Sequence, residues 1–219
     1  GPSIYDWFPS ELEPLPPFSQ RRDCPCLFVS HRKCDEDWAL RIGWLAREEG
    51  WDYWIDVLDP ALHALRAMNN LRTLTSAQKT LATAAIVEFA LLNCSHLMAV
   101  MTDSTRGSMW VPYEYGRVKV PVPFSTQVSC WTHPDLKAKD RPEYLVLGKV
   151  HQTECEIRQW LRWELSQWRE THGRCHRGAK AIWNGSEPDR LPGEPTEAKS
   201  PVSTPSMGID VEFGPGVVR

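Results

Sequence analysis

Cys26-Leu27-Phe28-Val29-Ser30 is the stretch that decides the fold class of this chain. A short, continuous apolar run of this kind is typical of a strand buried on both faces in a parallel sheet. The polar residues 31–34 follow as a loop, and Asp35 can cap a helix that Gly50 ends. The apolar positions of that helix recur at helical spacing: Trp38, Ile42, Leu45 and Ala46. We therefore interpret residues 26–50 as a strand, a loop and a helix.

Strands and helices alternate along the rest of the chain as well. Apolar runs predict four further strands, at 52–57, 97–102, 127–131 and 144–147. Helical patterns predict helices over 61–72, from the capping box Thr75-x-x-Gln78 onward, from Ser108 onward, and over 154–171 behind a second capping box, Thr153-x-x-Glu156. This alternation predicts an α/β fold, with helices on both faces of a parallel sheet. We expect a flavodoxin-like sheet of five strands in the order 2-1-3-4-5.

Two of these helices have an apolar face that predicts which side is buried. In the helix after Thr75 the face consists of Ala82, Ala85, Ile86, Phe89 and Leu92. In the last helix the apolar stripe consists of Ile157, Trp160, Leu161, Leu165 and Trp168. We expect both faces to pack in the core. The charged residues Arg158, Arg162, Glu164 and Arg169 lie outside the second stripe.

The composition limits the classes of function. A net charge of -3 gives no reason to expect nucleic-acid binding. No apolar run approaches the roughly 18 to 20 residues that cross a bilayer, so we expect a cytoplasmic protein that does not insert into membranes. Seven cysteines without regular spacing indicate free thiols in a reducing compartment. Zinc binding by Cys24-Pro25-Cys26 with His31 and Cys34 is an alternative, but we prefer buried thiols and expect no metal.

Three segments are expected along the 219 residues. Residues 1–23 comprise a Gly-Pro start that is typical of a removed tag and a Pro-rich arm. Residues 24–172 form one domain. Residues 173–219 are rich in Pro, Gly, Ser and Glu, which predicts an extended or disordered tail. If this tail is ordered, Ile209, Val211 and Phe213 alternate as a strand would and can pair with a sheet edge or another chain.

Residues 108–116, SMWVPYEYG, are the strongest functional candidate. Trp110 and Glu114 are four residues apart, so a helix would place both on one face. Pro112 is tolerated only in the first turn, which puts Glu114 close to the helix start. Ligands of doubly wound folds bind at the carboxyl ends of the strands where strand order reverses. In the expected order, this point brings the Ser30-His31 loop beside Ser108, Trp110 and Glu114.

These motifs together resemble the Toll/interleukin receptor (TIR) domain family, most closely its prokaryotic enzyme-type members. The resemblance covers about residues 24–171 and rests on motifs in the family's order: Phe28-Val29-Ser30-His31, Asp35, Trp54-x-Asp56, Cys94-Ser95-His96 and Ser108-x-Trp110-x-x-x-Glu114. Enzyme-type TIR domains cleave the nicotinamide-ribose bond of NAD. The products are nicotinamide and an ADP-ribose, a cyclic isomer or a conjugate. The fold that this resemblance implies is the flavodoxin-like one.

The resemblance also implies roles for individual residues. Glu114 matches the catalytic glutamate, and the substrate-binding positions match Ser30, His31, Ser108, Trp110 and Tyr113. The loop through which TIR domains self-associate matches Val57, Leu58, Asp59 and Pro60. NAD is then the substrate and no cofactor is needed. For Trp54 we favour core packing over substrate contact, and Asp56 can orient the loop that follows it.

The chemistry is consistent with a single carboxylate. Nicotinamide leaves as a neutral molecule from a cationic ring, so no general acid is required, and a carboxylate near the ribose can stabilise the oxocarbenium-like transition state. A stand-alone domain of this kind resembles the TIR protein of Thoeris-type anti-phage systems, whose nucleotide product is a signal for a separate effector after a phage-derived trigger. The alternative is a non-catalytic TIR adaptor that acts through homotypic contacts. The longer segment 61–85 and the Trp-rich last helix depart from the family pattern and leave the product undecided.

Overall fold

The computed structural model describes residues 24–70, 74–118, 126–173 and 186–193. The predicted arm, residues 1–23, and the tail apart from residues 173 and 186–193 lie outside the described residues. The strand suggested around Val211 lies outside them as well.

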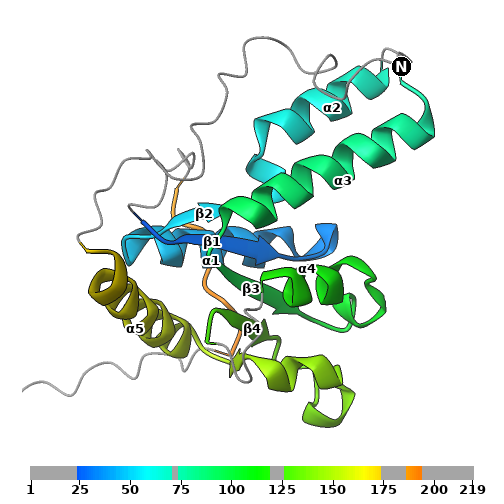
Figure 1. Ribbon diagram of the computed structural model, residues 1–219. Coiled ribbons are helices and arrows are strands. Elements are labelled where there is room, and N and C mark those ends of the chain that lie inside the picture. Colours follow the sequence, from blue (N-terminus) through cyan, green and yellow to red (C-terminus); the bar gives the residue numbers. More distant parts are fainter. Residues whose placement is uncertain (1–23, 71–73, 119–125, 174–185, 194–219) are drawn as a thin grey trace, which may run out of the picture.

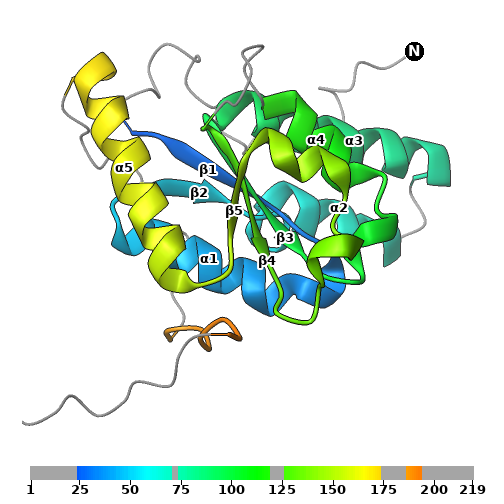
Figure 2. The same ribbon diagram turned by 90° about the horizontal axis from the view of Figure 1, so that it is seen from below.

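A five-stranded sheet forms the centre of the molecule (Figure 2). Its strands are β1 (Cys26–Ser30), β2 (Asp52–Trp54), β3 (His96–Met101), β4 (Val128–Thr132) and β5 (Lys149–His151). Neighbouring strands are parallel, and their order is β2-β1-β3-β4-β5. The predicted flavodoxin-like order is therefore confirmed.

Helices cover both faces of the sheet. The two that pack on one face are α1 (Glu36–Glu48) and α5 (Glu154–His172), while α3 (Ser76–Asn93) and α4 (Trp110–Val118) pack on the other. The remaining helix, α2 (Pro60–Asn70), packs against α3, and Figure 1 shows this pair extending beyond the sheet. The α/β architecture predicted from the alternation of strands and helices is confirmed.

Strand β1 illustrates why an unbroken apolar run forms the middle of such a sheet. Leu27 and Val29 belong to the core beneath α1 and α5, whereas Phe28 belongs to the core beneath α3 and α4. Successive side chains point to opposite faces, so both faces of a covered strand require apolar residues. The same alternation places the next position, Ser30, on the α3 and α4 side.

Local capping signals define the helix ends as predicted. Thr75 with Gln78 and Thr153 with Glu156 each form a reciprocal capping box, at the starts of α3 and α5. Gly50 follows α1 with a φ of 90°, a conformation that suits glycine because it lacks a Cβ.

Two strand predictions need correction. The apolar run 144–147 is not a strand, since residues Glu143–Leu147 form a 3-10 helix and β5 begins two residues later. Leu145 alone of Leu145, Val146 and Leu147 is buried, and Val146 is 71% exposed, so this run lacks the two-sided burial of a central strand. The second strand is also shorter than expected, because a 3-10 helix over Asp56–Leu58 follows β2.

The buried face of α3 differs from the predicted face. Ile86 packs with Leu62 and Leu65 of α2, while Val87, Ala90 and Leu91 pack on the sheet. The predicted Phe89 and Leu92 are instead exposed. One face of α3 packs against α2, and a different face, turned around the helix axis, packs against the sheet. A prediction with one apolar stripe therefore does not identify both buried faces.

The stripe on α5 is largely buried as predicted, but Glu164 is buried beside it. Its Oε2 lies 3.3 Å from His96 Nε2 of β3, and both residues are at most 4% exposed. Trp51, Trp160 and Trp168 surround the His96 ring. A polar pair therefore lies inside the aromatic part of this core.

A buried arginine joins α1, α5 and the described piece of the tail. Arg41 is 2% exposed, and its Nε and Nη2 donate to the two carboxylate oxygens of Glu154 at 2.8 Å each. Its Nη1 donates to Glu187 at 2.7 Å and to the carbonyl of Pro188. Leu191, which donates its backbone N–H to Glu154, is buried in the core. Residues 186–193 therefore pack against the domain.

The prediction of free thiols is wrong for one of the described cysteines, because Cys24 is disulfide-bonded. Disulfides are uncommon in reducing compartments, so this bond does not favour the predicted cytoplasmic location. Among the described residues, no helix is long and apolar enough to span a membrane. Within the same ranges, no group of three or more His, Cys, Asp or Glu residues could hold a metal ion.

Candidate functional site

The carboxyl end of β1 and the second turn of α4 meet at Ser30 and Glu114. Ser30 is the last residue of its strand and is 1% exposed, and Glu114 is 8% exposed. Ser30 Oγ donates a hydrogen bond of 2.5 Å to Glu114 Oε2. The predicted convergence of the β1 loop and the α4 motif is therefore confirmed for these two residues, and Figure 1 shows β1 running toward the end of the sheet at which α4 lies.

Burial changes the acidity of this carboxyl group. Loss of solvation raises the pKa of Glu114 from 4.5 to about 7, and the negative charge of Asp56 acts in the same direction. The hydrogen bond from Ser30 opposes these two effects, because it stabilises the charged form. Near neutral pH the group therefore exists in both protonation states, which suits a carboxyl that takes part in proton transfer or charge stabilisation.

His31 and Asp56 add two more polar groups at this end of the sheet. The His31 side chain is buried, its Nδ1 lies 3.2 Å from the carbonyl oxygen of Val29, and its Nε2 lies 3.2 Å from Asp56 Oδ1. The contact with Asp56 is too poorly aligned for a hydrogen bond, and neither atom has another partner among the described residues. Arg66 reaches the other carboxylate oxygen at 3.6 Å. The negative charge of Asp56 also raises the pKa of Glu114. From the sequence, Asp56 was expected only to orient the loop that follows it.

A second polar cluster joins the ends of β1 and β3. Asp35 is buried and its Oδ2 accepts hydrogen bonds from Thr102 Oγ1 at 3.1 Å and Ser104 Oγ at 2.7 Å. Its predicted role as a helix cap is wrong, because its side chain makes no capping hydrogen bond to α1, all of which lies in the described ranges. Arg32 donates to the carbonyl of Ser104 at 2.6 Å. These bonds hold together the two loops between which the strand order reverses.

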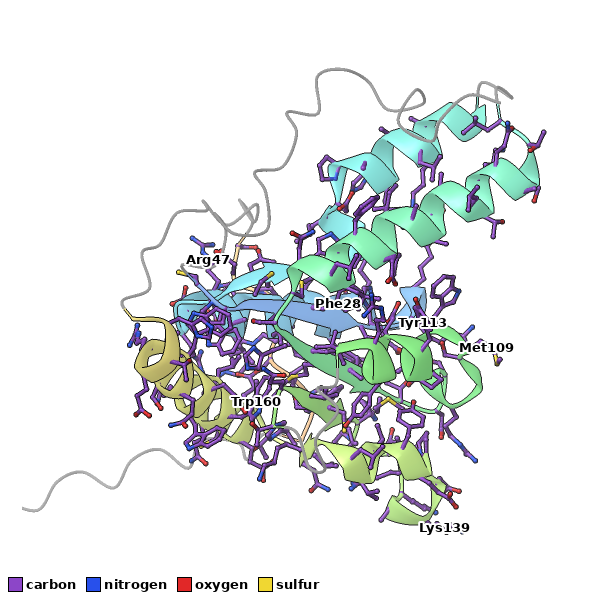
Figure 3. The ribbon with its side chains drawn as sticks, viewed as in Figure 1. Phe28, Arg47, Met109, Tyr113, Lys139 and Trp160 are labelled. Carbon is purple, nitrogen blue, oxygen red and sulfur yellow. The ribbon has the colours of Figure 1, made fainter. Side chains whose placement is uncertain are left out.

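The other residues predicted on the α4 motif are not buried with the Glu114 carboxyl. Ser108 Oγ accepts hydrogen bonds from the backbone N–H groups of Trp110 and Val111, so it caps the helix. Trp110 and Tyr113 are 46% and 47% exposed, their rings meet edge to face, and the Tyr113 hydroxyl donates to Glu88 of α3. Met109 lies at the outer edge of the molecule (Figure 3). Substrate binding by Ser108, Trp110 and Tyr113 stays a prediction.

The loop after β2 is held by a local network. Trp54 stacks on Phe28 with ring centroids 4.7 Å apart, which fits the core-packing interpretation, and its Nε1 donates to Asp59 Oδ2. Asp59 Oδ1 accepts the N–H groups of Ala61 and Leu62 and so caps α2. Val57 and Leu58 are partly buried against the core, and Pro60 is exposed. Self-association through this loop stays a prediction.

Comparisons with protein-family models, with curated proteins and with solved structures found no match for this chain. The assignment of a function therefore depends on the geometry and chemistry of the site.

The raised pKa of Glu114 has a consequence for stability that does not depend on function. A carboxyl that binds its proton more tightly in the folded chain stabilises the fold fully below about pH 4.5 and loses this contribution as the pH rises through about 7. Relative to Glu114→Gln, the native protein should lose about 3 kcal/mol of unfolding free energy across this window. Urea unfolding of both proteins at a series of pH values measures the difference. A difference that stays constant with pH would show that Glu114 titrates normally.

Proposed function

We propose that the protein is a TIR-type enzyme that cleaves the nicotinamide-ribose bond of NAD. The observation that carries this proposal is the Glu114 carboxyl, which is buried at the carboxyl end of a parallel sheet, hydrogen-bonded to Ser30, and has a pKa of about 7. Doubly wound folds bind their ligands at this end, beside the strand at which the order reverses.

Departure of nicotinamide leaves positive charge on the ribose, and an adjacent carboxylate stabilises that charge. Glu114 in its ionised form supplies this stabilisation, and the raised pKa lets it also accept a proton from an attacking hydroxyl. Ser30 holds one carboxylate oxygen and thereby orients the group. Because the carbonyl of Val29 can only accept, His31 Nδ1 carries the ring proton, and Nε2 is left as an acceptor. Nε2 of His31 and Oδ1 of Asp56, which make no hydrogen bond among the described residues, can both accept hydrogen bonds from ribose hydroxyl groups.

The product depends on which nucleophile attacks the ribose after nicotinamide has left. The proposal covers hydrolysis, cyclisation and transfer to another molecule. In the biological setting that we propose, the product is a nucleotide signal in bacterial anti-phage immunity, made after a phage-derived trigger and sensed by a separate effector of a Thoeris-type system. Self-association through residues 57–60 is part of this proposal, because TIR sites are often completed by a second protomer. Mass analysis of the product formed beside nicotinamide distinguishes the three reactions.

A specific observation supports the alternative of a TIR adaptor without catalysis. Met109, Trp110 and Tyr113 together expose apolar surface at the start of α4, and Met109 is 85% exposed. Exposed apolar residues that cluster in this way are typical of contact surfaces. An adaptor would self-associate without consuming NAD, whereas the enzyme consumes it.

The pH dependence of the reaction tests the role of Ser30 in the proposed mechanism. If ionised Glu114 is the active form, the rate of nicotinamide release should rise with pH through about 7. Ser30→Ala removes the hydrogen bond that lowers the pKa of Glu114, so the rise should move to higher pH and the rate at pH 7 should fall several-fold. Ser129→Ala, which removes another buried serine hydroxyl, in β4, should leave the profile unchanged. Identical profiles for native protein and Ser30→Ala would refute this mechanism.

A further inference from the structure

Two thiols face one another at the end of β1 that is opposite to Ser30. Cys26 is the first residue of β1, and Cys94 directly follows α3 as its C-cap. Their Sγ atoms are 3.3 Å apart, although 68 positions separate them in the chain. Both cysteines are free, and each residue is partly exposed. This pair belongs neither to the candidate site nor to the Cys24 disulfide.

The backbone holds the two cysteines in register. The N–H of Ser95 donates to the carbonyl of Cys26 at 3.0 Å, and the N–H of Cys26 donates to Ser95 Oγ at 3.1 Å. The N–H of Cys94 is in turn fixed to the carbonyl of Ala90 at the end of α3. The sulfur atoms must approach by about 1 Å to reach the disulfide bond length of about 2.05 Å, which rotation of the two side chains can supply.

The surroundings distinguish the two thiols. Burial raises the pKa of Cys94 well above its usual value, and the contact with Cys26 and the charge of Asp52 act in the same direction. Burial therefore disfavours the Cys94 thiolate, which makes Cys94 a poor first nucleophile toward an external reagent. Among the other described free cysteines, Cys34 and Cys155 are exposed and Cys130 is buried.

We propose that Cys26 and Cys94 form a reversible dithiol-disulfide site that is oxidised by small-molecule disulfides such as oxidised glutathione. The Cys26 thiolate attacks one sulfur of the reagent and releases one glutathione thiolate. Cys94 then gives up its proton and attacks the Cys26 sulfur, which breaks the mixed disulfide and releases the second glutathione. Two protein thiols are oxidised, one reagent disulfide is reduced to two thiols, and the two protons go to the released thiolates.

The new bond would join the start of β1 to the end of α3. Linking positions so far apart restricts the unfolded chain, so the oxidised protein should unfold at a temperature about 5 to 10 °C higher. The proposal is independent of the reaction proposed for Glu114, because the pair lies at the other end of the strand.

The test treats the full chain, purified without reductant, with oxidised glutathione and measures the intact mass after alkylation of the remaining thiols. Peptide mapping should show that Cys26 and Cys94 have each lost the alkyl group and that neither retains glutathione, together with the rise in unfolding temperature. Adducts at the exposed Cys34 and Cys155 are counted separately. Cys94→Ser should retain one glutathione at Cys26, and Cys26→Ser should show neither the adduct at Cys94 nor the temperature rise. Cys34→Ser and Cys155→Ser should still lose two alkylatable thiols.

Three outcomes would overturn the proposal. The first is an unchanged number of alkylatable thiols after treatment of the native chain. The second is a loss of two thiols that persists in both Cys26→Ser and Cys94→Ser, which would place the bond elsewhere. The third is a stable glutathione adduct at Cys26 of the native chain, located by peptide mapping, which would show that Cys94 does not resolve it.

Discussion

Replacing Glu114 by Gln is expected to lower the rate of nicotinamide release from NAD by at least about 100-fold. The amide has the same shape as the carboxyl and can still accept the hydrogen bond from Ser30, but it carries no negative charge for the developing oxocarbenium ion. Because the native carboxyl is buried and its charged form is destabilised there, the variant should fold at least as stably at pH 8. The rate is measured by chromatography of nicotinamide at matched protein concentrations.

A matched control separates this effect from a general change in charge. Glu143→Gln removes a carboxylate that is exposed in the 3-10 helix before β5, and it should leave the rate within about two-fold of the native value. If Glu114→Gln retained the native rate while the native protein was active, another group would have to stabilise the transition state.

Replacing Arg41 by Met is expected to lower the free energy of unfolding by about 3 to 5 kcal/mol. Burial by itself would raise the pKa of Glu154, but the hydrogen bonds from Arg41 and from the Leu191 N–H outweigh it and lower the pKa. Without Arg41 the buried Glu154 carboxylate loses two charge-assisted hydrogen bonds. Chemical denaturation at pH 7 measures the loss, which should shrink at lower pH as Glu154 takes up a proton.

The exposed partner of the same arginine serves as the control. The Glu187 side chain is 55% exposed, so Glu187→Gln should cost less than about 1 kcal/mol. If Glu187→Gln lowered the free energy of unfolding as much as Arg41→Met does, the ion pair between Arg41 and Glu187 would be the main stabilising contact of Arg41. The pairing of Arg41 with Glu154 would then contribute little.

Local patterns were sufficient to predict most of the fold. CLFVS at 26–30 predicts a strand covered on both sides, and the structure places Leu27 and Phe28 in opposite cores. The two capping boxes predict the starts of α3 and α5, because every group in a capping box lies within four residues of chain. The strand order followed from the alternation of strands and helices together with the usual topology of such sheets.

Features that depend on distant partners could not be read from the chain. Arg41 and Glu154 are 113 positions apart, and each alone has the pattern of a solvated helix residue. Glu164 was expected to lie outside the apolar stripe of α5. It is instead buried in the core, where its carboxylate contacts His96. The run 144–147 has strand-like composition, but only Leu145 of its three aliphatic residues packs in the core. The sequence alone does not show this one-sided burial.

The candidate site was predicted in part. The sequence places Ser30 and Glu114 on two loops that should converge, and the structure joins them by a hydrogen bond. The four-residue spacing of Trp110 and Glu114 predicts a shared face, but burial separates the two, since Trp110 is half exposed while Glu114 faces the sheet. The charge of Asp56 acts on Glu114 only because the β2 and β1 ends are neighbours in the sheet.

The most direct test of the central proposal is to incubate the native full chain with NAD at high protein concentration, where self-association is favoured, and to quantify nicotinamide. The account predicts one nicotinamide released for each NAD consumed, a second product that retains the ADP-ribose portion, and loss of both in Glu114→Gln. Consumption of no NAD at any protein concentration, by a chain that is folded and self-associated, would contradict it.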